Sequence, residues 1–183
     1  MALTFDELDA GTREHMLREF VAERESLDPY VPFRLTPHGV DLWPTLMEEA
    51  IESGSDESLH LALRGASGVL VSQETWVRNG ITRVRAVNHN QASEMLATSE
   101  FNTWYVRGLS AKLLQEGVAN VEVYRAGVPK WEVAGCASHE GRIVAAKDVY
   151  DGHRAAFWPV ENPTAFSVPF QPGCHHSIRR PVE

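Results

Sequence analysis

The sequence predicts an α+β protein with a helical N-terminal part, followed by a long helix and a small, loop-rich C-terminal domain that contains β-strands. Apolar residues recur at helical spacing through most of the first 117 positions, and short alternations of apolar and polar residues follow them. Prolines recur from position 129 onward and exclude long elements there. We therefore place a boundary near position 80, between a helical region at 1–80 and a second domain at 81–183.

Composition limits the classes of function. Of the 183 residues, 43% are apolar and 23% are charged, so the chain can form a hydrophobic core. The formal net charge of −8 argues against a protein whose main task is to wrap nucleic acid, because that task needs a basic surface. No apolar run approaches the roughly 18 to 20 residues of a membrane span, and the N-terminus lacks the features of a signal peptide. We expect no membrane span and a cytosol-like compartment.

The first helix is expected at 12–27. Thr12 can accept a hydrogen bond from a free N–H group at the helix start, and an apolar face begins at Met16. Two prolines in the segment 28–32 push the residues before them toward extended backbone. The helix should therefore end before this connector.

Two further helices are expected before the middle of the chain. Pro44 suits the first position of a helix at 44–53, because its missing N–H group would be unpaired there in any case. A short helix should follow at about 56–64. The glycine- and serine-rich segment 65–80 has no clear period, and we interpret it as a loop with at most one edge strand.

The most regular helical pattern runs from about 87 to 117 and predicts one long helix or two consecutive ones. Gly117 closes the pattern as a residue suited to the end of a helix. Short strands are then expected at 121–125, where apolar and polar residues alternate, and around 142–144 and 166–168. Such short elements need an additional constraint to form a stable domain.

Two cysteine and histidine pairs are the candidates for that constraint. Cys136 and His139 form a C-x-x-H pair, and Cys174 and His176 form a C-x-H pair. Two thiolates and two imidazoles can hold one tetrahedral Zn²⁺ at about 2.0 to 2.3 Å. Two other histidines nearby are alternative ligands, His153 and His175. The competing interpretation is that these residues merely occur together in a loop-rich region.

An active site is the other chemical interpretation of the same residues. Glu140 follows a candidate ligand and could act as a general base beside a catalytic zinc, which keeps an open position for water. Cys174 could also pair with a neighbouring histidine as a nucleophile, but the sequence identifies no third group to orient that histidine. The H-E-x-x-H helix and the deaminase pattern are absent from the sequence. We expect a closed structural site and no enzymatic activity.

Several segments carry a family resemblance. The chain contains TSEFN at 98–102 and LSAKLLQEGV at 109–118, then a predicted strand at 121–125, CASHEGRIV at 136–144 and FQPGCHH at 170–176. In this order they resemble the head morphogenesis, or minor capsid, family of tailed bacteriophages, typified by the F protein of phage Mu. The resemblance covers roughly 87–180 and says nothing about the residues before it.

The chain departs from the family pattern at three positions. His139 stands where the family usually has its second cysteine, and His176 stands where it has its last cysteine or histidine. Both changes leave a residue that binds zinc well. Gln171 replaces a histidine, which weakens the comparison if that histidine is a ligand. The resemblance thus favours a structural Zn²⁺ bound by Cys136, His139, Cys174 and His176.

The resemblance implies a structural protein of the virion, assembled in the host cytoplasm. Its expected place is a minor head or head-to-tail connector position near the portal, where it would contribute to head assembly and head-tail joining. Expected partners are the portal and other head and connector proteins, with DNA contact possible but not indicated and no membrane partner. The alternatives are a zinc-dependent hydrolase or nuclease that acts during phage assembly and, less favoured, an effector delivered to the host.

The predicted helices at 12–27 and 44–53 suggest how copies could meet. Helices of this length are marginal alone and need a packing partner. A neighbouring subunit in a homo-oligomeric ring, or the portal, could be that partner. The competing expectation is that these helices fold back on the long helix at 87–117 and complete a core within one chain.

Overall fold

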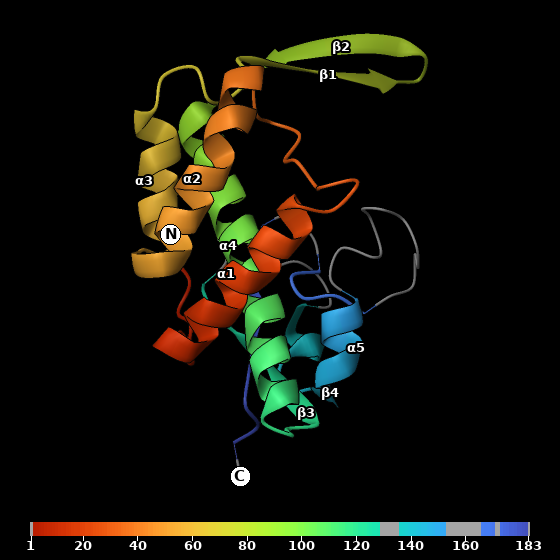
Figure 1. The fold of residues 1–183 in the computed structure, drawn as a ribbon. Helices are drawn as coiled ribbons and strands as arrows, with labels where there is room; N and C mark the ends of the chain where they lie inside the picture. The colour runs from red at the N-terminus through yellow and green to blue at the C-terminus, as the bar shows by residue number, and fades with distance from the viewer. Residues whose placement is uncertain (1, 129–135, 153–165, 171–172, 183) are drawn as a thin grey trace.

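The computed structural model describes residues 2–128, 136–152, 166–170 and 173–182, and it confirms the α+β class (Figure 1). A single long helix forms the centre, as one of the two sequence interpretations expected. The elements in chain order are α1 (Ala10–Arg24), α2 (Pro37–Ser53), α3 (Asp56–Gly65), β1 (Gln73–Arg78), β2 (Ile81–Ala86), α4 (His89–Gln115), β3 (Asn120–Arg125), the short 3-10 helix η1 (Cys136–His139), β4 (Ile143–Ala145), α5 (Ala146–Asp151) and β5 (His176–Arg179).

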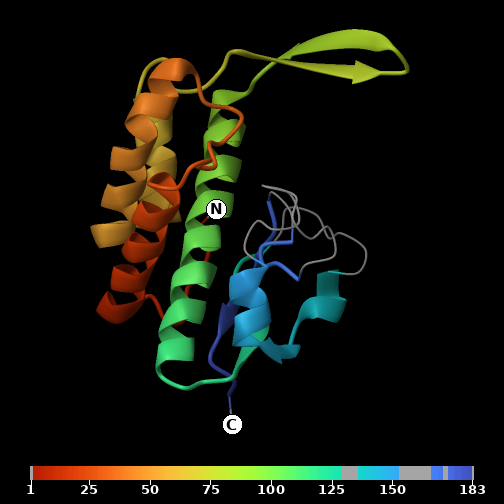
Figure 2. The same ribbon diagram turned by 45° about the vertical axis from the view of Figure 1, so that its right-hand side comes forward.

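Helix α4 separates the two parts of the molecule. Helices α1 to α3 lie on one side of it, and β3, β5 and α5 lie on the other (Figure 2). It is buried on several faces, with Phe101, Trp104 and Leu109 almost fully enclosed. One hydrophobic cluster runs from Met16 in α1 to Ile178 in β5. Within the described residues, no helix is both long enough and apolar enough to cross a membrane.

The helices before α4 fold back onto the core of their own chain. Met16 and Phe20 of α1 and Met47 and Ile51 of α2 are buried in the shared cluster. The ring of Phe20 meets that of Trp104 edge-on, with centroids 5.1 Å apart. The apolar faces of α1 and α2 are therefore used within the chain, which is the competing expectation stated above.

Helix α1 lies very close to α4 because a glycine faces it. A Cβ atom added to Gly108 would lie 2.6 Å from the backbone nitrogen of Met16, far inside van der Waals contact. Ion pairs flank this approach on both sides: Arg107 Nε lies 2.6 Å from Glu19 Oε2, and Lys112 Nζ lies 2.6 Å from Asp9 Oδ2. No side chain could be inserted at 108 without moving α1.

Two helix starts differ from the sequence predictions. Helix α1 begins at Ala10 because the side chain of Asp9 accepts a hydrogen bond from the N–H of Thr12, so Thr12 is inside the helix and is not its cap. The prediction that Pro44 begins the second helix was wrong. Thr36 caps α2, and Pro44 lies inside it. The loss of one backbone hydrogen bond at Pro44 is tolerated in a helix that buries apolar residues on both sides of it. The third helix closely matches the expected range.

The segment predicted as a loop contains half of a β-hairpin. Strand β1 pairs antiparallel with β2 over all six residues of each strand. Asn79 and Gly80 connect them, both with positive φ, at 53° and 73°. This is the backbone of a tight hairpin turn, and an Asn-Gly step is its strongest sequence signal. The hairpin crosses position 80, where the sequence placed a boundary between domains.

The C-terminal sheet has the order β4-β3-β5, with both pairs antiparallel. Strands β3 and β4 lie close to the predicted ranges. The prediction of a strand at 166–168 was wrong, and the third strand is instead β5. Pro169 follows the predicted segment and cannot donate a ladder hydrogen bond. Helix α5 was not predicted, because six residues are too few to show a helical period.

Candidate metal centre

The two cysteine and histidine pairs approach each other beside the middle of α4. The short helix η1 carries the first pair, and the second pair lies at the start of β5. The ring centroids of His139 and His176 are 5.9 Å apart. Residues separated by 37 positions in the sequence are thus brought together by the pairing of β5 with β3.

The second pair has the spacing of two ligands on one zinc. Cys174 Sγ lies 3.5 Å from His176 Nδ1, and the backbone N–H of His176 points at the same sulfur at 3.4 Å. Two ligands of a tetrahedral zinc, with Zn–S near 2.3 Å and Zn–N near 2.0 Å, are about 3.5 Å apart. Both side chains are buried, at 8% and 3% exposure. This pair therefore fits a shared metal ion.

His139 is held by an aromatic contact. Its ring lies against Phe170 with centroids 4.1 Å apart and a tilt of 31°, and Phe170 also packs against His176 at 5.8 Å. Arg142 Nη1 lies 3.4 Å from His139 Nδ1. The ring of Phe170 therefore covers one side of both imidazoles.

The ligand set as a whole is not complete in the described residues. The side chain of Cys136 and all of His153 lie outside them. The ring of the alternative ligand His175 lies beside Gly127. Among the side chains that are described, no group of three histidine, cysteine or acidic residues is placed to hold a metal. Zinc binding by Cys136, His139, Cys174 and His176 stays a prediction.

Electrostatics around the cluster favour a neutral His176. Burial lowers its pKa below the ordinary 6.5, so the imidazole is uncharged near neutral pH, as a metal ligand must be. Its Nε2 lies 3.5 Å from Glu140 Oε1. Arg125 donates to the same oxygen at 2.6 Å, and this hydrogen bond lowers the pKa of Glu140 below 4.5. Glu140 is thus an ionised carboxylate that faces Nε2 of His176 and orients the imidazole ring.

Glu140 also supplies the third group that the sequence did not identify. Cys174, His176 and Glu140 stand in the order of nucleophile, base and orienting carboxylate. The same order describes a metal ligand whose other ring nitrogen is fixed by a carboxylate. The sulfur of Cys174 is buried and accepts a backbone N–H, which suits a ligand better than a nucleophile that must meet a substrate.

Helix α4 fixes the backbone of the second pair. Ser99 Oγ accepts the N–H of Gly173 at 2.9 Å, and Asn102 Nδ2 donates to the carbonyl oxygen of His176 at 2.8 Å. Both side chains are buried, Asn102 fully. They belong to the TSEFN segment that carries the family resemblance. The segment could be identified from the sequence, but its hydrogen bonds to the backbone of residues 173–176 could not.

Replacement of Asn102 by alanine is expected to reduce stability by about 1–3 kcal/mol, because the buried His176 carbonyl loses its donor. The same change should weaken the predicted zinc binding, since the carbonyl belongs to a candidate ligand. Asn90→Ala, an exposed position in the same helix, is the control and should change neither property. Thermal unfolding and zinc titration measure both. Equal zinc affinity in the two variants would show that this hydrogen bond does not position the second pair.

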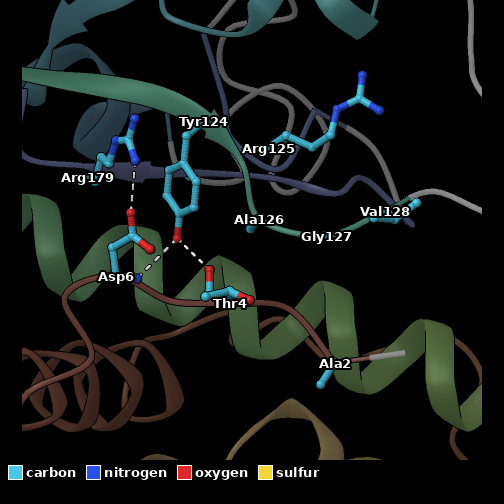
Figure 3. Close-up of a pocket in the computed structure, with 9 residues that line it drawn as sticks. All are labelled: Ala2, Thr4, Asp6, Tyr124, Arg125, Ala126, Gly127, Val128 and Arg179. Atoms are coloured by element: carbon cyan, nitrogen blue, oxygen red, sulfur yellow. Dashed lines mark hydrogen bonds and ion pairs between the residues drawn. The ribbon is translucent and has the colours of Figure 1, made fainter.

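A surface pocket of about 580 Å³ lies where the N-terminal segment crosses β3 (Figure 3). The hydroxyl of Tyr124 lies between Thr4 and Asp6, donating to the Thr4 carbonyl at 2.6 Å. Arg179 Nη1 reaches Asp6 Oδ2 at 3.0 Å. The other arginine of the pocket, Arg125, points away from Tyr124 and pairs with Glu140. Because both cations have acidic partners, we assign this pocket no ligand.

Comparison with models of protein families, with curated proteins and with solved structures found no match to this chain. The function proposed below therefore rests on the contacts described above. It also rests on the resemblance of the segments between 98 and 176.

Proposed function

We propose that the protein is a structural component of a tailed-bacteriophage particle. Its place is a minor head or head-to-tail connector position near the portal, where it contributes to head assembly and head-tail joining. One observation carries the proposal: Ser99 and Asn102 hydrogen-bond the backbone at Gly173 and His176, 74 positions away in each case. Two segments that separately resemble the phage family are therefore one physical unit. If both short similarities were coincidental, there would be no reason to expect the two segments to contact each other.

The proposed zinc would be structural. Cys136 and His139 would bind it from η1, and Cys174 and His176 from the start of β5. The ion would join η1 to the sheet. The buried pair with its 3.5 Å sulfur to nitrogen distance supports this role, as does the neutral state of His176.

The zinc-dependent hydrolase or nuclease is the second candidate, and Glu140 is the observation in its favour. A carboxylate beside a zinc ligand can activate water. However, the ion pair with Arg125 lowers the pKa of Glu140 and makes it a weak base. A metal-dependent cleavage of DNA that is lost in Glu140→Gln would support this candidate over the structural one.

Virions purified on a density gradient are expected to contain the intact chain at far fewer copies than the major capsid protein. The reason is that a component near the portal occupies one vertex, whereas the shell is built from many copies. Quantitative mass spectrometry of the particles measures the ratio, with a host cytoplasmic protein as the contamination control. Presence of the chain in infected cells but not in particles would contradict a structural role in the virion.

A further inference from the structure

We propose that the β1–β2 hairpin is an assembly arm that docks on the exposed acidic face of α2 in a second copy of this chain. We call residues 73–86 the arm. Two antiparallel strands of six residues give it a length of about 20 Å at about 3.3 Å per residue. It projects away from the helices in both ribbon views (Figures 1 and 2).

The arm exposes apolar side chains that a free hairpin would not be expected to keep in water. Val77 is 68% exposed, Ile81 58% and Val84 57%, and Trp76 is 40% exposed. A two-stranded hairpin is at best marginally stable when nothing packs against it. Among the described residues, no helix or third strand covers either face of the arm. A surface that covers it in the working protein would explain both features.

The register separates the arm into two faces. Residues of one face alternate with residues of the other along each strand. The uncharged face consists of β-branched side chains, Thr75, Val77, Thr82 and Val84. The basic face carries Trp76, Arg78, Ile81 and Arg83. Arg78 and Arg83 have no ion-pair partner among the described residues.

The direction of the arm is fixed at its root. Glu74 lies between two arginines, with Arg34 Nε at 2.5 Å and Arg85 Nη2 at 2.7 Å. The guanidinium group of Arg85 also stands over the ring of Trp76, 5.4 Å from its centroid. The N–H of Val87 donates to the carbonyl of Ser72 at 2.9 Å and closes the base. A fixed arm loses little conformational freedom when it docks.

The exposed face of α2 complements the arm in charge. Asp41, Glu49 and Glu52 are exposed there and have no ion-pair partner among the described residues. Helix α2 contains no lysine or arginine. Within the described part of one chain, none of these carboxylates pairs with an arginine of the arm, and the arm points away from the helices (Figures 1 and 2). A second copy brings both sets together.

Docking of an arm on the next copy is a head-to-tail contact. Each copy then offers one arm and one acidic face, so the contact can repeat until a ring closes. Nucleic acid is a poorer occupant, because two unpaired arginines on a chain of net charge −8 give little attraction to phosphate. Self-association of this kind does not depend on whether the protein is found in a virion.

Reversal of charge on the two surfaces tests the proposal. The arm variant is Arg78→Glu with Arg83→Glu, and the helix variant is Glu49→Arg with Glu52→Arg. Sedimentation velocity across a concentration series should show assembly of the parent chain and a monomer for each variant alone. An equal mixture of the two variants should assemble again, because each acidic arm then meets a basic helix. Arg64→Glu, an exposed position on α3, is the charge control and should assemble like the parent.

A neutral variant tests the apolar part of the contact. Trp76→Ala should raise the concentration for half-assembly by about tenfold, the scale of losing one aromatic residue from an interface. Leu27→Ala removes a more exposed apolar side chain outside the arm and should have no effect. A parent chain that stays monomeric, variants that assemble like the parent, or a mixture that fails to assemble would overturn the proposal. Binding of duplex DNA through the arm by a monomeric parent would overturn it as well.

Discussion

Replacement of Cys174 by serine is expected to remove zinc from the purified protein and to lower its melting temperature by about 10 °C. A ligand present at a thousand times its Kd adds about 4 kcal/mol to the free energy of unfolding, and each kcal/mol shifts the melting temperature of a chain of this size by about 2–4 °C. Cys136→Ser should behave in the same way. Metal analysis and thermal unfolding give both quantities.

A chelator separates loss of zinc from damage caused by the substitution itself. It should lower the melting temperature of the parent to the level of Cys174→Ser and leave the variant unchanged. Hydrogen exchange should accelerate most around β5, which carries His176, and its partner β3, and least in α1 and α3, which pack on α4. A metal-free parent that is fully folded, with both cysteine variants equally stable, would remove zinc from the account.

Gly108→Val is expected to destabilise the protein by about 3 kcal/mol or more, the upper range for overpacking a core. The reason is that even a Cβ atom at this position would lie 2.6 Å from the backbone nitrogen of Met16. A backbone atom cannot turn aside as a flexible side chain can. Helix α1 would have to move away from α4, which would also open the contact between Phe20 and Trp104.

Gly65→Val is the matched control for this prediction. Gly65 is a helical glycine too, the last residue of α3, but nothing lies within 4 Å of an added Cβ atom there. The free energy of unfolding of Gly65→Val should differ from that of the parent by less than about 1 kcal/mol, the scale of helix propensity. Chemical denaturation of both variants gives the comparison. Equal stability of the two would mean that α1 is free to shift along α4.

Most helices could be predicted from the sequence because their buried faces repeat at helical spacing. The start of α2 could not be placed by Pro44, since the cap at Thr36 and the burial of Met47 outweigh one missing hydrogen bond. The hairpin was missed although Asn79 and Gly80 signalled its turn. Every residue of the arm except Glu74 is exposed, so burial imposes no visible alternation on it.

The candidate site was only partly predictable. The spacing of Cys174 and His176 suggested a ligand pair, and the structure places their side chains 3.5 Å apart. Contacts between segments that are far apart in the sequence produce no recognisable spacing of residues along the chain. The hydrogen bond from Asn102 to the His176 backbone depends on how α4 and β5 meet. The position of Glu140 beside His176 depends on how the residue after η1 meets β5. Such contacts need the fold.

The two ends of the described chain are tied to the same sheet. Thr4 donates its N–H to Ala126 beside β3 at 2.7 Å, and Arg179 of β5 pairs with Asp6 across 173 positions of sequence. Contacts between such distant positions close large loops and form slowly, whereas helices on a central helix form from nearer contacts. During synthesis on a ribosome, α1 to α4 can therefore pack together before β5 emerges. The proposed metal centre, which needs β5, would be the last part of the molecule to take shape.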